Sequence, residues 1–446
     1  MTVFDGLAET GGDDEFKAWL SKMIDAKAGD FGEFDKWLKG SFNLSLVVKF
    51  EDVKEVIRFP KPGHTATCLR DEKVRNEIHV LEMLKEKTTI PVPRVLSWGT
   101  TAESLQQLGP FILMEYIEGV SLTTLLKQPT ETDQDEVILA TEVDDARLDY
   151  VYEQLAGYLL QLSHLSFNAI GALSRDSASE EWTVHSRPLA YNQNELQTVV
   201  SSYPSTNFPT SAFISAREYL QNLADEHLIH LHTQRNLANT RDDAKKRFIA
   251  RHRFKQLVDK YCSDDTGPFK LFCDDLQPSN MLADPETFRI TAVLDWEFTN
   301  VMPAQFSYDP PWWLLLLGPD MWLEEHSMEE FMVRYVPRME QFLRALERVE
   351  ANTSDIARSE ADGGSERCLS LKMRESWSSK KFWFDYGIRK SFDIDAVYWD
   401  ALHEGEADEK FLEQKGMREE MERFVDMKME QLGLYRDEYR KRFSSG

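Results

Sequence analysis

The stretch Leu271-Phe-Cys-Asp-Asp-Leu-Gln-Pro-Ser-Asn280, followed by Val293-Leu-Asp-Trp-Glu-Phe298, carries the most informative pattern in the chain. It offers a carboxylate at Asp275, an amide at Asn280 and a second carboxylate at Asp295, which ends an apolar run. Phosphoryl transfer from magnesium-ATP needs such groups. One carboxylate meets the acceptor hydroxyl, while an amide oxygen and another carboxylate hold the metal against the phosphates. The pattern therefore predicts Asp275 as the catalytic base and Asn280 and Asp295 as Mg²⁺ ligands.

The segment between the two motifs predicts how they come together. Residues 281–283 and 288–294 are predicted strands that flank the turn-forming Asp284-Pro-Glu-Thr287, which is a strand-turn-strand pattern. A hairpin would bring the oxygen ligands close enough to share one ion. The alternative is an ordinary hairpin with a capped turn and surface acids, because short motifs also occur by chance.

Composition limits the class of protein. A chain of 446 residues can bury a large core and is expected to divide into two or three substructures. Its formal net charge of −25 argues against nucleic acid as the main partner. No apolar run approaches the roughly 20 residues that a membrane-spanning helix requires. The sequence therefore predicts a soluble protein whose partner is neither nucleic acid nor a membrane.

The cysteines and the N-terminus predict the compartment. Cys68, Cys262, Cys273 and Cys368 are widely separated and lack the paired spacing of a metal site. Such cysteines are typical of reduced thiols rather than of a disulfide framework. The first residues are too acidic for a secretory signal, and their apolar residues are interrupted by polar ones. We therefore expect a cytoplasmic protein.

The first part of the chain predicts a small sheet with one helix. Residues 14–38 carry apolar side chains at helical spacing, so we expect a helical extension over residues 1–37. The other predicted elements are strands at 45–50 and 55–59, a helix at about 70–86, and a buried strand at 111–117. Together, residues 38–118 are expected to form an N-lobe, a nucleotide-binding sheet with one helix.

Beyond Gly119 helical patterns predominate. An acidic, polar segment at 128–145 predicts a loop, and helical spacing follows at 148–162 and over most of 190–262. After the hairpin the chain is aromatic-rich and helical, apart from a flexible stretch at 352–366. We therefore predict an α+β chain with two lobes. The larger, mainly helical C-lobe would cover 119–446 and contain the catalytic hairpin at 271–298.

Glu77 supports a nucleotide site independently of the hairpin. It lies three residues after Val74 and four before Leu81, so it projects beside the apolar stripe of its helix. A carboxylate against a core is costly unless a cation meets it, and Arg58 on an apolar strand is the expected partner. Such a pair would aim a guanidinium at phosphate oxygens. The alternative pairs Glu77 with Lys73 on a wet surface.

Two further segments supply candidate nucleotide contacts. They are Gly40, Ser41 and Asn43 in a glycine turn, and Met114, Glu115 and Tyr116 where the lobes would join. The turn could lie over the phosphates because glycine permits close backbone approach. In the second segment, backbone groups could bond an adenine edge while the methionine packs on its face. The alternatives are a plain hairpin turn and a plain core strand.

Trp312 and Trp313 follow the metal carboxylate closely in sequence. Aromatic residues at such positions wall an acceptor pocket or belong to the core, and most aromatic runs at helical spacing are core. Both interpretations stay open from the sequence alone.

With these motifs together, the chain resembles the aminoglycoside phosphotransferase and choline kinase-like family, especially the phosphotransferase-like proteins of filamentous fungi. The resemblance covers about residues 35–320. The family's His-x-Asp-x-x-x-x-Asn loop matches Asp275 and Asn280, and its Ile-Asp-Trp/Phe-Glu segment matches Asp295. Its phosphate-contacting basic residue and the partner of that residue match Arg58 and Glu77. The resemblance implies a protein-kinase-like bilobal fold, ATP and Mg²⁺ as cofactors, and O-phosphorylation of a small molecule.

Three positions depart from the family pattern. Cys273 replaces the loop histidine that buttresses the loop, Asp274 replaces a glycine before the base, and Arg58 replaces a lysine. A carboxylate beside Asp275 could raise its pKa or attract an additional metal. The chain also lacks the His-Arg-Asp, Asp-Phe-Gly and Ala-Pro-Glu motifs, which disfavours a eukaryotic protein kinase.

The sequence thus predicts an ATP-dependent O-phosphotransferase that acts on a hydroxyl group of a small molecule. One alternative is a non-catalytic nucleotide-binding or partner-binding protein on the same fold, which the changes at Cys273 and Arg58 favour. A third use of the same site would be adenylyl transfer or ATP-driven condensation. Neither the acceptor nor the oligomeric state follows from the sequence.

Overall fold

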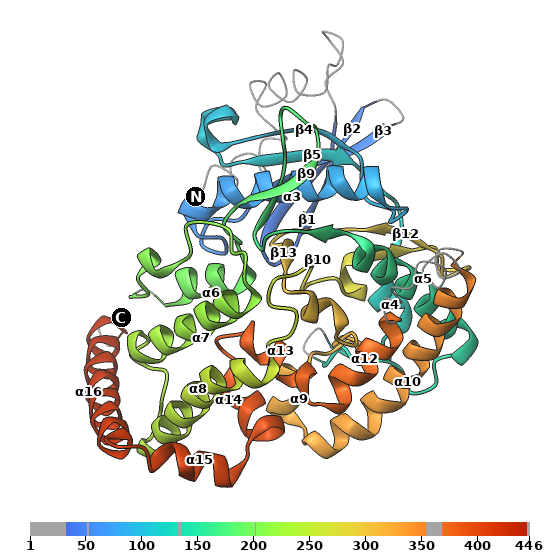
Figure 1. The fold of residues 1–446 in the computed structure, drawn as a ribbon. Helices are drawn as coiled ribbons and strands as arrows, with labels where there is room; N and C mark the ends of the chain where they lie inside the picture. The colour runs from blue at the N-terminus through green and yellow to red at the C-terminus, as the bar shows by residue number, and fades with distance from the viewer. Residues whose placement is uncertain (1–32, 51–52, 133–134, 201, 354–367, 444–446) are drawn as a thin grey trace.

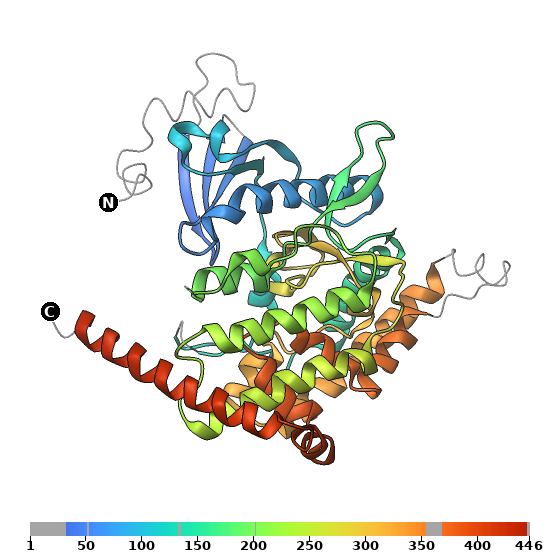
Figure 2. The same cartoon turned by 60° about the vertical axis from the view of Figure 1, so that its left-hand side comes forward.

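The computed structural model describes residues 33–50, 53–132, 135–200, 202–353 and 368–443. A five-stranded antiparallel sheet forms the N-terminal region, and helices form most of the remainder (Figures 1 and 2). The predicted α+β class is therefore confirmed, with a small antiparallel-sheet region and a larger, mainly helical one. Within the described residues, no helix combines the length and the apolar character needed to cross a bilayer.

The N-terminal sheet has the strand order β1-β2-β3-β5-β4. The strands are β1 (Glu33–Lys39), β2 (Asn43–Phe50), β3 (Val53–Pro60), β4 (Val95–Gly99) and β5 (Phe111–Glu115). Helix α3 (Arg70–Lys87) covers one face, where its Val74 and Ile78 cluster with Ile112 and Met114 of β5. The strands predicted at 45–50, 55–59 and 111–117 and the helix predicted at 70–86 are confirmed.

The helical extension predicted before residue 38 is wrong where it can be checked. Residues 1–32 lie outside the described part, but residues 33–39 form strand β1, which pairs with β2 so that Trp37 lies opposite Leu46. Trp37 packs against the sheet cluster that contains Leu46 and Val48. Pairing with β2 and burial of the indole override the local helical spacing, since strand formation depends on its partners more than on propensity.

The helical region confirms the predicted helices at 148–162 and over much of 190–262. Its helices are α4 (Leu122–Leu126), α5 (Asp145–His164), α6 (Tyr191–Val199), α7 (Ala216–Thr233), α8 (Arg241–Tyr261), α9 (Pro319–Glu325), α10 (Met328–Asn352), α12 (Leu369–Ser378), α13 (Lys381–Ile388), α14 (Ile394–Val397), α15 (Gly405–Leu412) and α16 (Met417–Phe443). Asp144 caps α5 by accepting from Arg147 N–H at 2.9 Å, so most of the loop predicted at 128–145 precedes a helix start. The stretch predicted to be flexible falls largely on residues 354–367, outside the described part.

Short sheets bring the two sequence motifs to the junction of the regions. Strand β10 (Phe269–Phe272) leads into the loop 273–280, and β11 (Met281–Ala283) and β12 (Ile290–Val293) form the predicted hairpin. Strand β6 (Val120–Ser121) comes directly from the N-terminal region and pairs with β11.

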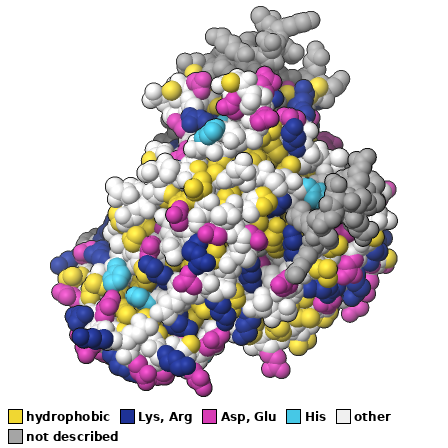
Figure 3. Space-filling view, viewed as in Figure 1, with side chains coloured by type: hydrophobic (Ala, Val, Ile, Leu, Met, Phe, Trp, Pro, Cys, Tyr) yellow, Lys and Arg dark blue, Asp and Glu magenta, His cyan; other side chains and the backbone are white. Residues whose placement is uncertain are grey.

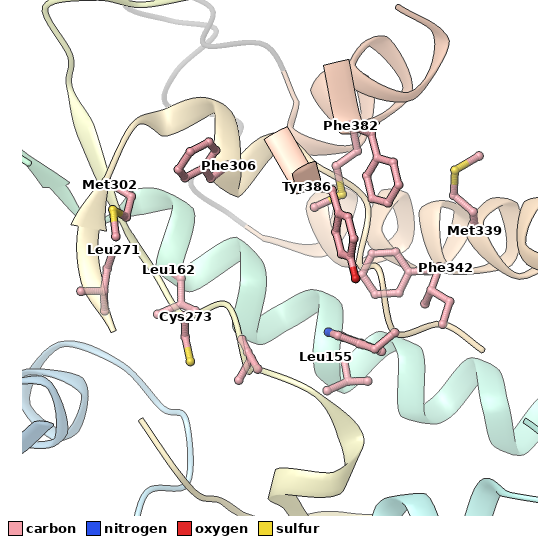
Figure 4. Packing of buried hydrophobic residues seen from close by; sticks show 14 of the residues in the cluster. Leu155, Leu162, Leu271, Cys273, Met302, Phe306, Met339, Phe342, Phe382 and Tyr386 are labelled. Carbon is pink, nitrogen blue, oxygen red and sulfur yellow. The ribbon is translucent and has the colours of Figure 1, made fainter. Parts of the chain in front are cut away.

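The loop 273–280 rests on the main hydrophobic core. Figure 4 shows part of this core, in which Leu162 of α5 lies near Leu271 and Cys273, and Phe382 and Tyr386 of α13 lie near Phe342 of α10. Such close-packed interiors resist deformation. The packed core therefore restricts the movement of the loop 273–280.

Candidate active site

A cleft with a volume of 1170 Å³ lies between the sheet region and the helical region. Its lining includes every residue predicted to take part in the site: Gly40, Ser41, Asn43, Arg58, Glu77, Met114, Glu115, Tyr116, Asp275, Asn280 and Asp295. Ligand sites usually measure about 300–1000 Å³, so this cleft is large enough for a small-molecule ligand. On the face drawn in Figure 3, apolar side chains gather toward the junction of the two regions, whereas charged side chains of both signs spread over the helical region.

Asp275 and Asn280 are joined directly. Asn280 Nδ2 donates to Asp275 Oδ2 at 2.7 Å and to the Asp275 carbonyl oxygen at 3.0 Å. Gln277 Nε2 donates to the other carboxylate oxygen at 2.5 Å. Burial raises the pKa of Asp275 to about 6, with smaller contributions from Asp274 and Glu297, although the two amide hydrogen bonds act in the opposite direction. A carboxyl group with this pKa can take up a proton near neutral pH.

Asp295 lies next to this pair across the hairpin. The Leu294 N–H donates to the Asn280 carbonyl oxygen at 2.7 Å, which places the residue before Asp295 beside the loop. Asp295 has a φ of +59°, a left-handed conformation that non-glycine residues rarely adopt and that concentrates at functional sites. Burial, then Glu297 and Glu77, raise its pKa to about 8 against the opposing effect of Arg58 and Lys73.

The predicted pair of Arg58 and Glu77 is present. Arg58 Nη2 forms an ion pair with the Glu77 carboxylate, and Arg58 Nη1 lies 3.3 Å from Asp295 Oδ1. The Glu77 side chain is only 2% exposed, so the alternative of a wet surface pair with Lys73 is wrong. Burial alone would lower the pKa of Arg58, but Glu77, Asp295 and Glu297 outweigh it and raise that pKa. A permanently charged guanidinium thus faces the cleft between two carboxylates.

A second buried ion pair, which the sequence analysis missed, joins Lys73 to Glu297. Lys73 Nζ also donates to Asn43 Oδ1 at 3.1 Å, and Asn43 Nδ2 donates to Glu297 Oε2 at 2.8 Å. Lys73 precedes Glu77 by one helical turn, and Glu297 follows Asp295 by two residues. These spacings were the available signal. The three side chains tie the glycine turn to the segment that carries Asp295.

The predicted adenine contacts need one correction. The N–H groups of Glu115 and Tyr116 donate to the carbonyl oxygens of Arg94 and Lys54, each at 3.1 Å. Both donors are therefore already used within the sheet region and are not available to a base. The backbone continues its pairing one residue past β5, which the sequence pattern did not indicate.

The glycine turn reaches across the cleft. Gly40 N–H donates to the Asn43 carbonyl oxygen at 3.2 Å, and Lys61 Nζ donates to the Gly40 carbonyl oxygen at 2.5 Å. Between these residues, the Phe42 ring lies 5.4 Å from the Tyr191 ring of α6, measured between centroids. The turn therefore contacts both sides of the cleft.

The cleft lining also includes residues from the C-terminal part of the chain: Trp312, Leu316, Leu317, Gly318, Asp320, Met321, Arg389 and Lys390. Trp312 lines the cleft, whereas Trp313 is buried in the core. The core interpretation is confirmed for Trp313, and a role of Trp312 in an acceptor pocket stays a prediction. Lys390 Nζ lies 5.4 Å from the Trp312 ring centroid and 3.8 Å from Asp320 Oδ2.

The structure also places the departures from the family pattern. Cys273 is buried, and burial raises the pKa of its thiol, which keeps it neutral. Asp274 pairs with Arg389 at 2.5 Å. Among the described residues, no group of three or more His, Cys, Asp and Glu side chains is arranged to hold a metal. The four cysteines are free thiols, as expected.

The curated relatives include proteins from yeasts. The chain is 24% identical over 322 residues to "Altered inheritance of mitochondria protein 9, mitochondrial" of Clavispora lusitaniae, covering 64% of this chain and 51% of that protein. It is 25% identical over 310 residues to the protein of the same name from Debaryomyces hansenii, covering 61% and 48%. The chain thus spans about half the length of these relatives. Because they are named as mitochondrial, the expectation of a cytoplasmic protein is contradicted.

Two solved structures with a similar fold are an aminoglycoside phosphotransferase and an ethanolamine kinase. Aminoglycoside phosphotransferase APH(4)-Ia, in a ternary complex with AMP-PNP and hygromycin B, is 14% identical, with 87% of this chain and 99% of that one covered and a TM-score of 0.43. Plasmodium vivax ethanolamine kinase is 13% identical, with 90% and 81% covered and a TM-score of 0.41.

The sequence pattern of the phosphotransferase enzyme family matches residues 45–309. This match covers more than half of the chain, and it includes Arg58, Glu77, Asp275, Asn280 and Asp295. It confirms the resemblance inferred from the motifs. The chain belongs to the phosphotransferase enzyme family.

Proposed function

We propose that this protein is an ATP-dependent O-phosphotransferase that acts on a hydroxyl group of a small molecule. The observation that carries the proposal is the convergence of Asp275, Asn280, Asp295 and Arg58 on one cleft between the two regions. In this proposal residues 38–118 form the lobe that holds the nucleotide. Residues 119–446 form the lobe that holds the acceptor.

Asn280 and Asp295 fit a magnesium ion by their donor chemistry. Mg²⁺ prefers oxygen ligands and is usually held by one or two carboxylates together with substrate phosphates. The Asn280 amide nitrogen is bonded to Asp275, which leaves the amide oxygen for a cation. Burial and neighbouring carboxylates raise the pKa of Asp295, a sign of excess negative charge that a cation would relieve. Bound there, the ion would neutralise charge on the β- and γ-phosphates.

Asp275 is proposed to act on the acceptor hydroxyl. The hydroxyl oxygen forms a bond to the γ-phosphorus, and the bond between that phosphorus and the β,γ-bridging oxygen breaks, so ADP leaves with the bonding electron pair. Asp275 takes the hydroxyl proton, which a pKa of about 6 allows near neutral pH. In this proposal, most of the rate acceleration comes from positioning of the reactants and from charge neutralisation.

Arg58 is proposed to contact the phosphates. Its guanidinium lies between Glu77 and Asp295 at the cleft, and its planar fork suits phosphate oxygens. Glu77 holds it in place. The glycine turn at Gly40, Ser41 and Asn43, which Lys73 and Glu297 fix, is proposed to cover the phosphates.

The relatives' names also bear on where the protein works. We propose a mitochondrial location for this chain, because the yeast proteins that it matches are named as mitochondrial. Fractionation of cells that express the tagged protein tests this. Recovery in the cytosolic fraction alone would contradict it.

The direct test is a screen of hydroxylated small molecules for acceptor-dependent formation of ADP from ATP. Asp275→Asn serves as the blank, because it keeps the shape of the side chain and loses the base. Asp284→Asn is the matched control, since this carboxylate belongs to the hairpin turn and bonds only turn residues in the structure. Formation of AMP instead of ADP would favour adenylyl transfer. Equal activity in the Asp275 variant and the unaltered protein would refute the assignment.

One observation favours a second candidate, a nucleotide-binding protein without turnover. In the structure Arg58 already contacts the carboxylate proposed to hold the metal. A thermal-shift measurement with ATP, with and without Mg²⁺, separates the two together with the ADP assay. Nucleotide binding that needs no Mg²⁺ and yields no ADP would favour the non-catalytic protein.

A further inference from the structure

Asp274, the residue before the candidate base, is held by two side chains from the C-terminal part of the chain. Arg389 Nη1 donates to Asp274 Oδ1 at 2.5 Å. Trp312 Nε1 donates to the Asp274 carbonyl oxygen at 3.1 Å. Both donors lie beyond residue 309, where the match to the family pattern ends.

A hydrogen bond and two aromatic rings hold the Arg389 guanidinium in place. Arg389 Nε donates to the Asp385 carbonyl oxygen at 2.7 Å. Arg389 Cζ lies 4.6 Å from the Phe272 ring centroid and 5.0 Å from the Phe306 ring centroid. The side chain is 9% exposed. Phe272 ends strand β10 immediately before the loop 273–280. Arg389 thus makes a cation–π contact with Phe272 and a charged hydrogen bond with Asp274.

The segment that carries Arg389 is itself anchored in the helical region. His227 of α7 bonds the Ile388 carbonyl oxygen at 2.7 Å and Ser391 Oγ at 2.8 Å. Arg251 of α8, which is fully buried, donates to the Ser391 carbonyl oxygen at 3.0 Å. Residues on both sides of Arg389 are therefore tied to two long helices, so the guanidinium has little freedom to move.

Two other carboxyl groups face this guanidinium. Asp385 and Asp309 are both within its electrostatic reach. Burial raises the pKa of each, which favours their neutral forms. Of the three groups, Asp274 is the one whose carboxylate bonds Arg389 directly.

We propose that Arg389 is a positioning residue for phosphoryl transfer, which acts through Asp274 to hold the loop 273–280 so that Asp275 faces the acceptor. This inference rests on the proposed function. Arg389 and Lys390 also line the cleft. In this proposal the same short segment lies beside the acceptor and positions the base, which links acceptor binding to the position of Asp275.

Four variants test the inference: Arg389→Gln, Arg389→Lys, Asp274→Asn and the double variant Arg389→Gln/Asp274→Asn. A misplaced base costs up to about 100-fold in rate, so we expect Arg389→Gln and Asp274→Asn each to lower kcat by about 10- to 100-fold. The KM for ATP should stay within about twofold, because the nucleotide contacts proposed above come from the sheet region and not from Arg389 or Asp274. Arg389→Lys should recover part of the rate, since it keeps the charge without the fork. The double variant should be no worse than the more affected single variant, because both remove one interaction.

Hydrogen exchange of peptides that cover residues 273–280 gives a readout independent of activity. We expect faster exchange there in Arg389→Gln and in Asp274→Asn. Arg374→Gln is the matched control, because Arg374 pairs with Glu340 and Glu347 on α10, away from the cleft. It should change neither the exchange of the loop nor kcat. If Arg389→Gln does not fold, Asp274→Asn removes the same bond from the loop side.

The outcomes separate the two proposals. Unchanged loop exchange in both single variants would overturn the Arg389 inference, whatever the activity. Faster exchange with an unchanged kcat, or losses that multiply in the double variant, would overturn its positioning role. If no acceptor yields ADP with the unaltered protein, the proposed function fails and the positioning role falls with it. The exchange data then still decide whether Arg389 holds the loop.

Discussion

Lys73 and Glu297 form a buried ion pair that joins helix α3 of the sheet region to the segment carrying Asp295 in the helical region. Their side chains are 1% and 5% exposed. The same helix carries Glu77, which pairs with Arg58 one turn further along. The placement of α3 therefore fixes both a cation proposed to contact the phosphates and a carboxylate beside the proposed metal site.

Removing one partner of this pair should be costly. Lys73→Met leaves Glu297 as an uncompensated buried charge, and breaking such pairs typically costs about 3–5 kcal/mol. We expect a loss of this size in the free energy of unfolding, measured by urea denaturation. The double variant Lys73→Met/Glu297→Gln should recover much of the stability, because no unpaired charge remains. A single variant as stable as the unaltered protein would contradict the prediction.

Asp275→Asn should separate binding from turnover. The amide cannot take the acceptor proton, and loss of a general base typically costs about 10²- to 10⁴-fold in rate. Nucleotide affinity, measured by calorimetry with ATP and Mg²⁺, should change little. A large loss of affinity would show instead that Asp275 holds the nucleotide or the metal.

Glu226 of α7 should make stability depend on pH. It is 1% exposed, and burial raises its pKa from the ordinary value of 4.5 to about 7, although Gln193 and Asn222 donate to it. The folded state then binds the proton more tightly than the unfolded state. Its favourable contribution is complete below about pH 4.5 and is lost as the pH rises through 7, by up to about 3 kcal/mol.

Glu226→Gln should remove this dependence. We expect the variant to match the unaltered protein near pH 5 and to be more stable at pH 8, as judged by urea midpoints. Glu218→Gln, an exposed change on the same helix, is the control and should keep the slope of the unaltered protein. Parallel stability curves for Glu226→Gln and the unaltered protein would show that this group is not responsible.

Gly119 should tolerate no side chain. A Cβ built there would lie 2.9 Å from the Leu282 Cβ, closer than real Cβ contacts. Gly119→Ala should therefore lower stability by about 1–3 kcal/mol through overpacking. Gly157→Ala on α5 is the contrasting control, because nothing lies within 4 Å of its Cβ position and alanine favours helices by about 1 kcal/mol. Thermal midpoints that move in the same direction for both variants would contradict the close packing of Gly119 against Leu282.

The sequence predicted the parts of the site whose residues are close together in the chain or whose pairing follows from the pattern of one helix. Asp275, Asn280 and Asp295 are close in sequence and joined by a hairpin, so their convergence could be inferred from turn and strand signals. Arg58 and Glu77 could be paired because a carboxylate beside an apolar stripe needs a cation. Neither inference required knowledge of distant packing.

The contacts that the sequence did not reveal are set by tertiary structure. Arg389 meets Asp274 across 115 positions of the chain, and Lys73 meets Glu297 between two lobes. A short spacing, such as the one helical turn between Lys73 and Glu77, does not identify the distant partner of either residue, because many charged residues have the same spacing to a helix stripe. Strand β1 was misassigned for a related reason, since only its partner β2 decides between strand and helix.

Trp312, Met321, Arg389 and Lys390 line the cleft beyond the stretch shared with the family, whereas the groups proposed to handle phosphate lie inside it. If the protein is the phosphotransferase proposed above, substitutions in this C-terminal part of the lining would change its acceptor preference and leave the groups that handle phosphate unaltered.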